Sequence, residues 1–253
     1  MCATCGCSSE TILELHEHDH EHGHDHNHDH DHDHSHSKTR TVTLEQAVLA
    51  RNDALAERNR KWLAERSILA VNLMSSPGAG KTTLLERTIR ELGAELRVSV
   101  VEGDQETVLD ADRIRATGAP AIQINTGQGC HLDAKMLASG LQTLDPPEGS
   151  VVLIENVGNL VCPALFDLGE QARVVITSVT EGAEKPRKYP QMFRAADLVL
   201  LNKIDLLPYV KFDVDDFLDG ARRANPGVEV LQLSATTGDG IADWYGWLRA
   251  RLP

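Results

Sequence analysis

A glycine-rich run, Ser75-Ser76-Pro77-Gly78-Ala79-Gly80-Lys81-Thr82-Thr83, lies between an apolar stretch and a helical one. In a loop that joins a strand to a helix, backbone N–H groups surround phosphate oxygens, a lysine reaches the β and γ phosphates, and a threonine hydroxyl ligates Mg²⁺. Ser75 stands where the usual pattern has its first glycine, but Gly78 and Gly80 supply backbone freedom. We therefore predict that Lys81 and Thr82 are catalytic and that the phosphates are bound by Gly78, Ala79, Gly80, Lys81, Thr82 and Thr83.

A second run, Asn202-Lys203-Ile204-Asp205, directly follows the apolar stretch 198–201. The Asp205 carboxylate can accept two hydrogen bonds from the N1–H and the exocyclic amine of guanine, a donor pair that adenine lacks. The stem of Lys203 is expected to lie over the base. Ser234 and Ala235 follow the next apolar stretch and resemble the companion guanine-binding loop. The nucleotide is therefore predicted to be GTP, bound in part by Asn202, Lys203, Asp205, Ser234 and Ala235.

Two carboxylates, Asp104 and Glu155, stand at the ends of apolar runs. A carboxylate at a strand end beside a phosphate-binding loop is well placed to hold Mg²⁺ directly or through water. We predict that Asp104, Glu155 and Thr82 hold Mg²⁺, that Glu155 is catalytic, and that the Gly158 backbone N–H tracks the γ-phosphate. The alternative is that both acids are solvated side chains at loop starts. No glutamine that would position water is evident, so slow intrinsic hydrolysis is expected.

The amino terminus combines three thiols with many imidazoles. Cys2, Cys5 and Cys7 fall within six residues, and 11 of the 12 histidines lie between His16 and His36. Thiolates, with the α-amine of Cys2 once Met1 is removed, favour a four-coordinate Ni²⁺ or Zn²⁺ site. The histidines offer weaker metal sites at neutral pH. A redox pair of cysteines and a solvated acidic tail with incidental histidines remain the alternatives.

Three further ligand-type residues, Cys130, His131 and Cys162, lie in loops of the main domain, and Cys162 is four residues beyond Gly158. A metal site there would be close to the predicted γ-phosphate sensor. A buried cysteine that acts as a small apolar residue is the alternative. Nickel and zinc suit these ligands equally well.

The elements that must position these residues follow from the alternation of apolar runs with helical stretches. The tail, residues 1–40, has no core to bury and is expected to be mobile. Thr43 with Gln46 fits a capping box, which predicts an amphipathic helix over 43–66 that leads into one domain, residues 41–253. Such alternation predicts an α/β fold, a mostly parallel sheet with helices on both faces. The strands are expected over 68–74, 97–102, 121–125, 151–156, 174–180, 198–202 and 228–233.

Charge and composition narrow the location and the partners. The formal net charge is −13, which disfavours binding to nucleic acid. We find no signal peptide and no apolar run of transmembrane length, and the cysteine count of 5 is odd. The expected protein is therefore cytoplasmic, without insertion into a membrane.

Taken in order, Cys-x-x-Cys-Gly-Cys, the histidine-rich run, Ser-Pro-Gly-Ala-Gly-Lys-Thr-Thr, Glu-Asn-Val-Gly-Asn and Asn-Lys-Ile-Asp resemble the HypB family over essentially the whole chain. That resemblance implies a P-loop NTPase fold of the signal-recognition-particle-like GTPase class. It implies a GTPase that inserts nickel during hydrogenase maturation, dimerises with nucleotide and works with HypA and a hydrogenase large subunit precursor. It also implies a tight nickel site at Cys2, Cys5 and Cys7 and a weaker one at Cys130, His131 and Cys162, near the dimer interface.

The expected mechanism is a switch in which GTP and Mg²⁺ order the loops around Asp104 and Glu155, promote dimerisation and change the geometry at Cys162. Hydrolysis then relaxes the site and releases nickel. Lys185 or Lys188 is a candidate for a cation that acts across the dimer. Two other functions remain open: a sibling GTPase for urease or a cobalamin-dependent enzyme, and a nickel-storage protein.

Overall fold

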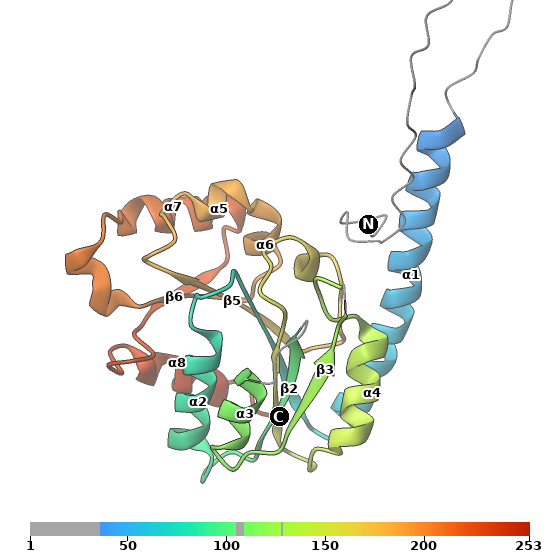
Figure 1. The fold of residues 1–253 in the computed structure, drawn as a ribbon, viewed down its shortest axis with the longest axis horizontal. Helices are drawn as coiled ribbons and strands as arrows, with labels where there is room; N and C mark the ends of the chain where they lie inside the picture. The colour runs from blue at the N-terminus through green and yellow to red at the C-terminus, as the bar shows by residue number, and fades with distance from the viewer. Residues whose placement is uncertain (1–35, 105–108, 128) are drawn as a thin grey trace, which may run out of the picture.

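A computed structural model describes residues 36–104, 109–127 and 129–253 (Figure 1). The predicted metal ligands Cys2, Cys5 and Cys7 lie outside the described residues, as does the histidine-rich run up to residue 35. In the part of the chain that is described, no helix is both long and apolar enough to cross a membrane.

The centre of the domain is a single sheet of seven strands, and every neighbouring pair is parallel. Buried parallel strands are apolar on both faces, which explains why their sequences are nearly continuous apolar runs. The predicted α/β architecture is therefore confirmed. In spatial order the strands are β3 (Ala121–Asn125), β2 (Val98–Asp104), β4 (Val151–Glu155), β1 (Leu69–Ser75), β5 (Ala172–Ser178), β6 (Leu198–Asn202) and β7 (Glu229–Gln232).

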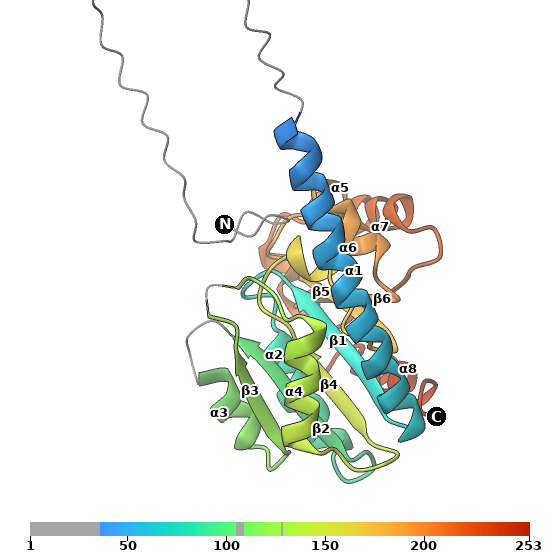
Figure 2. The same ribbon diagram turned by 90° about the vertical axis from the view of Figure 1, so that its right-hand side faces the viewer.

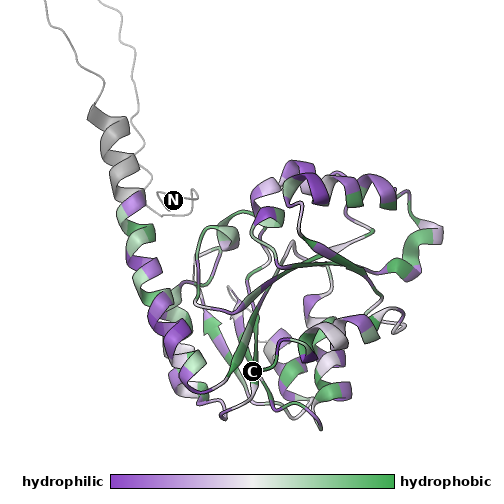
Figure 3. Ribbon diagram, turned by 180° about the vertical axis from the view of Figure 1, so that it is seen from behind, coloured by the Kyte–Doolittle hydropathy of each residue, from purple (hydrophilic) through white to green (hydrophobic). Residues whose placement is uncertain are grey.

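Helices cover both faces of the sheet. Both faces need cover because successive apolar residues of each strand point to opposite faces. On one face, Leu73 and its neighbours pack against α2 (Lys81–Leu92), α3 (Leu109–Arg115) and α8 (Ile241–Arg249). On the other face, Ile154 and its neighbours pack against α1 (His36–Glu65) and α4 (Ala134–Leu144), which lie side by side in Figure 2. The same face carries α6 (Pro190–Arg194) and α7 (Val214–Ala224) over β5 and β6. Figure 3 shows the sheet as mostly hydrophobic and the outer helices as mixed.

Helix α1 begins before the start that the sequence predicted for it. It begins at His36, so Thr43 lies inside the helix and does not form an amino-terminal capping box with Gln46. No proline or glycine interrupts residues 36–43, which leaves nothing to stop the helix at Thr43. The carboxyl-terminal half of α1 is fastened to the body by Asn59, whose side-chain amide donates to the carbonyls of Ala134 and Leu168, both at 2.8 Å.

Candidate nucleotide pocket and thiol cluster

The glycine-rich loop leads from β1 into α2 and needs glycine at two positions. Gly78 and Gly80 have positive φ angles of 77° and 100°, a region that favours glycine. A Cβ atom at Gly80 would also lie 2.5 Å from Nδ2 of Asn202, so the loop approaches β6 closely. Beside the loop is a pocket of about 490 Å³. The predicted residues that line it are Gly78, Gly80, Lys81, Thr82, Thr83, Asp104, Glu155, Gly158 and Lys203.

Lys81 is held by the residue that departs from the usual motif. Its ammonium donates to the Ser75 hydroxyl at 2.8 Å, and the lysine is only 8% exposed. Burial lowers the pKa of Lys81, and the nearby carboxylate of Glu155 opposes that shift. Ser75 therefore gives a buried cation a partner at the bottom of the pocket, a role that its place in the sequence does not reveal.

Glu155 and Thr82, two of the three predicted Mg²⁺ ligands, are in direct contact. The Thr82 hydroxyl donates to Oε1 of Glu155 at 2.8 Å, and Glu155 is 5% exposed. Burial raises the pKa of Glu155 to about 7, although Lys81 and Thr82 both favour the carboxylate. Its Oε2 atom has no hydrogen-bond partner among the described residues. A buried oxygen of this kind beside a hydroxyl, with Asp104 in the same pocket, fits the oxygen ligands that Mg²⁺ prefers.

Glu102 also lines the pocket, although it is not among the site residues predicted from the sequence. It is 2% exposed, and burial together with the neighbouring Glu155 raises its pKa to about 8. Its Oε2 atom likewise has no partner among the described residues. The available signal was spacing, because Glu102 is two residues before Asp104 and must share a face of β2 with it.

Two residues of α3, Asp110 and Arg113, are further pocket residues that the sequence analysis missed. The Arg113 guanidinium contacts Asp110 at 3.2 Å and Glu86 at 2.9 Å. Helix α3 follows β2 along the chain, but no motif in its sequence indicates that its side chains would reach the pocket.

The predicted base-reading residues form a second group beside the pocket, and Asn202 ties their loops together. Its amide donates to the Ala79 carbonyl at 2.9 Å, and its Oδ1 accepts from the backbone N–H of Ala235 at 3.0 Å and of Lys203 at 2.8 Å. The Lys203 ammonium donates to the Gly78 carbonyl at 2.7 Å. Asn202 therefore fixes the relative position of three loops.

Asp205 and Ser234 complete this second group. Asp205 keeps a buried Oδ1 atom with no partner among the described residues, as an acceptor for a ligand would. Ser234 is fully buried, and its hydroxyl accepts from the N–H of Thr237 at 3.0 Å. The serine thus shapes its loop through contacts within the loop itself.

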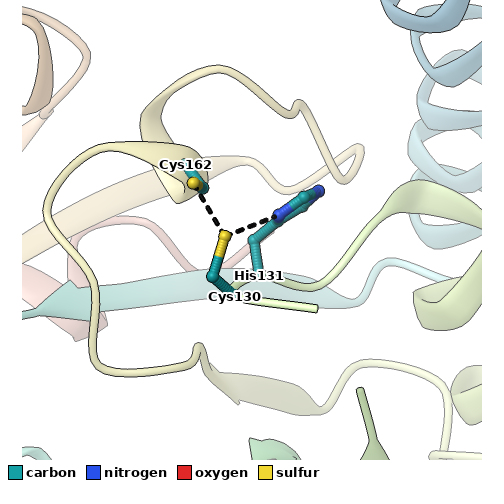
Figure 4. Close-up of side chains that lie close together, drawn as sticks. All are labelled: Cys130, His131 and Cys162. Carbon is teal, nitrogen blue, oxygen red and sulfur yellow. Dashed lines mark hydrogen bonds between the residues drawn. The ribbon is translucent and has the colours of Figure 1, made fainter. Parts of the chain in front are cut away.

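Cys130, His131 and Cys162 come together on one side of the domain (Figure 4). Their ligand atoms all lie within 4.8 Å of one another, with the two Sγ atoms 2.8 Å apart and Nδ1 of His131 3.7 Å from the Cys130 sulfur. The His131 ring stacks on Phe166 at 3.9 Å between centroids, and burial lowers its pKa. A neutral imidazole with two thiols is a suitable donor set for nickel or zinc. We call these three residues the thiol cluster.

One segment, residues 155–162, connects the pocket to the thiol cluster. In the middle of the segment, a Cβ atom on Gly158 would lie 3.0 Å from Pro77, so the segment packs against the phosphate-binding loop. At its end, the Asn159 side chain donates to the Cys130 carbonyl at 3.4 Å and accepts from the Val161 N–H at 2.8 Å. The segment therefore contacts both sites directly.

Lys185 and Lys188, the candidates for a cation across a dimer, are the first and last residues of the short helix α5 (Lys185–Lys188). The Lys188 ammonium contacts Glu184 at 2.7 Å, and the Lys185 ammonium lies 5.3 Å from the centroid of the Tyr189 ring. These are contacts within one chain, and the role of either lysine across a dimer stays a prediction.

Comparison with known proteins agrees with this geometry. The family model for the CobW/HypB/UreG nucleotide-binding domain matches residues 69–232. The hydrogenase maturation factor HypB of Azotobacter vinelandii is 57% identical over 205 residues, which are 81% of this chain and 68% of that protein.

Two solved structures have the same fold. The crystal structure of hydrogenase maturation factor HypB from Archaeoglobus fulgidus is 43% identical, with a TM-score of 0.75 over 81% of this chain and 100% of that one. That of HypB from Helicobacter pylori in complex with nickel is 35% identical, with a TM-score of 0.74 over 79% of this chain and 94% of that one. The seven-stranded parallel sheet with its phosphate-binding loop is thus a P-loop NTPase fold. This chain belongs to the HypB family of hydrogenase maturation factors, within the CobW/HypB/UreG group of nucleotide-binding proteins.

Proposed function

We propose that this chain is a GTP-hydrolysing nickel metallochaperone that delivers nickel for assembly of the NiFe-hydrogenase active site. The observation that carries the proposal is the single segment, 155–162, that lines the nucleotide pocket at Glu155 and Gly158 and supplies Cys162 to the thiol cluster. Gly158, the proposed γ-phosphate sensor, is only four residues from Cys162 along this segment.

The nucleotide half of the proposal rests on three features of the pocket. The buried ammonium of Lys81 and the amino-terminal end of α2 would hold the phosphates. Thr82, Asp104 and Glu155 would hold Mg²⁺, which neutralises negative charge on the phosphate oxygens when it is bound. The unpartnered oxygen of Asp205 would accept the two guanine donors. Slow turnover is expected because none of the described residues that line the pocket is a glutamine.

The nickel half rests on the donor set. Two thiols and an imidazole within 4.8 Å suit a soft or borderline divalent ion, with nickel as the cargo and zinc as a competitor. The solved HypB of Helicobacter pylori is in complex with nickel, which supports nickel here. We further propose that Cys2, Cys5 and Cys7 form a tighter nickel site in a metal-binding tail, residues 1–40, attached to a GTPase domain, residues 41–253.

In the proposed cycle, GTP binding orders the loops at Asp104 and Gly158 and promotes a homodimer in the cytoplasm. The segment 155–162 then shifts Cys162 relative to Cys130, and hydrolysis reverses the shift and releases nickel. A HypA-type chaperone and the hydrogenase large subunit precursor are the proposed partners. The γ-phosphate supplies the contacts that distinguish the two states.

The deciding experiment uses the nickel-loaded full chain, Mg²⁺ and a metal-free hydrogenase large subunit precursor. We expect nickel in the re-isolated precursor with GTP, and much less with ATP or with a non-hydrolysable GTP analogue. Nickel that stays on the chain with every nucleotide would indicate storage. Transfer to metal-free urease instead of the precursor would indicate the sibling function.

A further inference from the structure

A pair of buried glutamates lies at the bottom of the pocket. Glu102 of β2 and Glu155 of β4 are register partners in the parallel sheet, so their side chains point to the same face. That face carries α2, because Oε1 of Glu155 accepts the hydrogen bond from Thr82 at 2.8 Å. The two residues are 2% and 5% exposed. Two acidic groups are therefore held next to each other, out of bulk water.

Neither glutamate has a full set of hydrogen-bond donors. The Oε2 atom of each lacks a partner among the described residues, and the buried Lys81 ammonium donates to Ser75. Leaving such oxygens without a donor costs free energy, so native proteins rarely do so without a functional reason. The site is built with more acceptors than the protein itself satisfies.

A third buried glutamate shows what a structural role looks like in this chain. Glu170 is 6% exposed, and its Oε1 accepts from Arg173 at 2.7 Å and from Asn72 at 3.1 Å. Its Oε2 accepts from the Leu168 N–H at 2.8 Å. Both oxygens of Glu170 are satisfied inside the protein, whereas Glu102 points an unsatisfied oxygen at a pocket.

We propose that Glu102 is a positioning residue for the nucleotide-bound magnesium, whose bound water donates to the carboxylate of Glu102. This inference rests on the proposed function, in which Thr82, Asp104 and Glu155 hold the ion. Water on a divalent cation supplies the missing donors, and the charge of the ion offsets the two buried carboxylates. Outer partners of this kind orient a metal site and commonly change its affinity by 10 to 100-fold.

The test is Mn²⁺ binding to the complex of the full chain with GDP, followed by electron paramagnetic resonance and by water-proton relaxation. We expect Glu102→Gln to weaken Mn²⁺ binding by about tenfold and to alter the relaxation signal of metal-bound water. Binding of GDP in EDTA should stay as in the wild type, because Glu102 is not placed against the phosphates directly. The metal-free variant should unfold at the same temperature or a higher one, since the amide has nearly the shape of the carboxyl group and carries no charge that burial could penalise.

Two controls separate this role from others. Asp112→Asn removes the same charge from an exposed position of α3 and should leave Mn²⁺ binding unchanged. Glu170→Gln should lower the unfolding temperature without changing Mn²⁺ binding to the folded protein. The inference is overturned if Glu102→Gln binds Mn²⁺ like the wild type, or destabilises the metal-free protein as Glu170→Gln does. If the wild-type complex itself binds no Mn²⁺, the magnesium part of the proposed function is overturned as well.

Discussion

The nucleotide pocket is fastened by several independent contacts, whereas the thiol cluster depends on the position of two loops. In the pocket, Asn202 binds three loops together, and Lys81 is anchored on Ser75. In the cluster, Cys130 and Cys162 belong to separate loops, which are joined by the bond from the Asn159 side chain to the Cys130 carbonyl at 3.4 Å and by the bond from the Leu132 N–H to Oδ1 of Asn156 at 3.2 Å. A pre-arranged site binds its ligand with little reorganisation. We therefore propose that nucleotide binding is the fixed event and that nickel affinity is the quantity it changes.

The largest expected effect is a loss of nucleotide binding that leaves nickel binding intact. Lys81→Ala removes a buried cation that would make two charge-assisted hydrogen bonds to phosphate, so GDP affinity should fall by about 1000-fold. A fluorescent GDP titration measures this loss. Lys135→Ala, at an exposed position of α4, is the matched control and should bind GDP normally. Nickel binding by the cluster should survive in Lys81→Ala, and its loss there would show that the two sites are not separable.

From the metal side, Cys162→Ser should do the reverse. In a protein that also carries Cys2/Cys5/Cys7→Ala, the substitution removes one of the three cluster ligands. Nickel affinity should fall by about 100-fold or more, because a direct ligand contributes at least as much as an outer partner, whose loss costs about 10 to 100-fold. Thiolate-to-nickel absorption measures the affinity. GDP affinity should be unchanged, and a parallel loss of GDP would mean that Cys162 supports the fold of the pocket instead.

The base-reading group tests how specific the fixed site is. Asp205→Asn replaces one acceptor with an amide donor, so GDP affinity should fall by about 30-fold. The xanthine nucleotide, which presents an acceptor in place of the exocyclic amine, should bind the variant better than it binds the wild type. Competition titrations with both nucleotides measure the exchange. An unchanged preference for guanine would remove Asp205 from the base-binding role.

The same contrast explains how much could be predicted from the sequence. The predicted strands 121–125 and 198–202 agree with β3 and β6, because a buried parallel strand is a local apolar run. The phosphate-binding loop is equally local. The predicted start of α1 at Thr43 was wrong because the residues before Thr43 carry no signal that would end the helix there. Ser75 and Glu102 gained their places only through packing between neighbouring strands and α2, which no short motif records.

A smaller effect is expected from a change in segment 155–162, which connects the pocket to the thiol cluster. Asn159→Ala removes the hydrogen bond to the Cys130 carbonyl and the bond that orders its own loop at Val161, and each such bond contributes about 1 kcal/mol. Nickel affinity of the cluster should fall by about fivefold, and the difference between nucleotide states should shrink. Asn125→Ala, which removes an exposed side-chain contact to Gly127, is the control. Full retention of nucleotide sensitivity would show that the signal travels elsewhere.

The smallest effect is on stability against pH. The pKa values of Glu102 and Glu155 are raised to about 8 and about 7, above the ordinary 4.5. At a pH between 4.5 and these raised values, the metal-free native state therefore holds more protons than the unfolded state. Their contribution to stability is therefore complete below pH 4.5 and is lost as the pH rises to 8. The lowered pKa of His131 works in the opposite sense on the acidic side. The contribution of Glu102 alone is the difference in unfolding temperature between the wild type and Glu102→Gln. Between pH 5.5 and pH 8.5 the wild type should lose more stability than the variant. A constant difference would contradict the assignment.

The central claim is that the nucleotide state sets nickel affinity at Cys130, His131 and Cys162. The most direct measurement is a nickel titration of the Cys2/Cys5/Cys7→Ala protein, followed by thiolate-to-nickel absorption, with GDP or with a non-hydrolysable GTP analogue bound. We predict two different dissociation constants for the same protein, and a difference that disappears when Lys81 is replaced by alanine. Equal nickel affinity in the two nucleotide states would contradict the account.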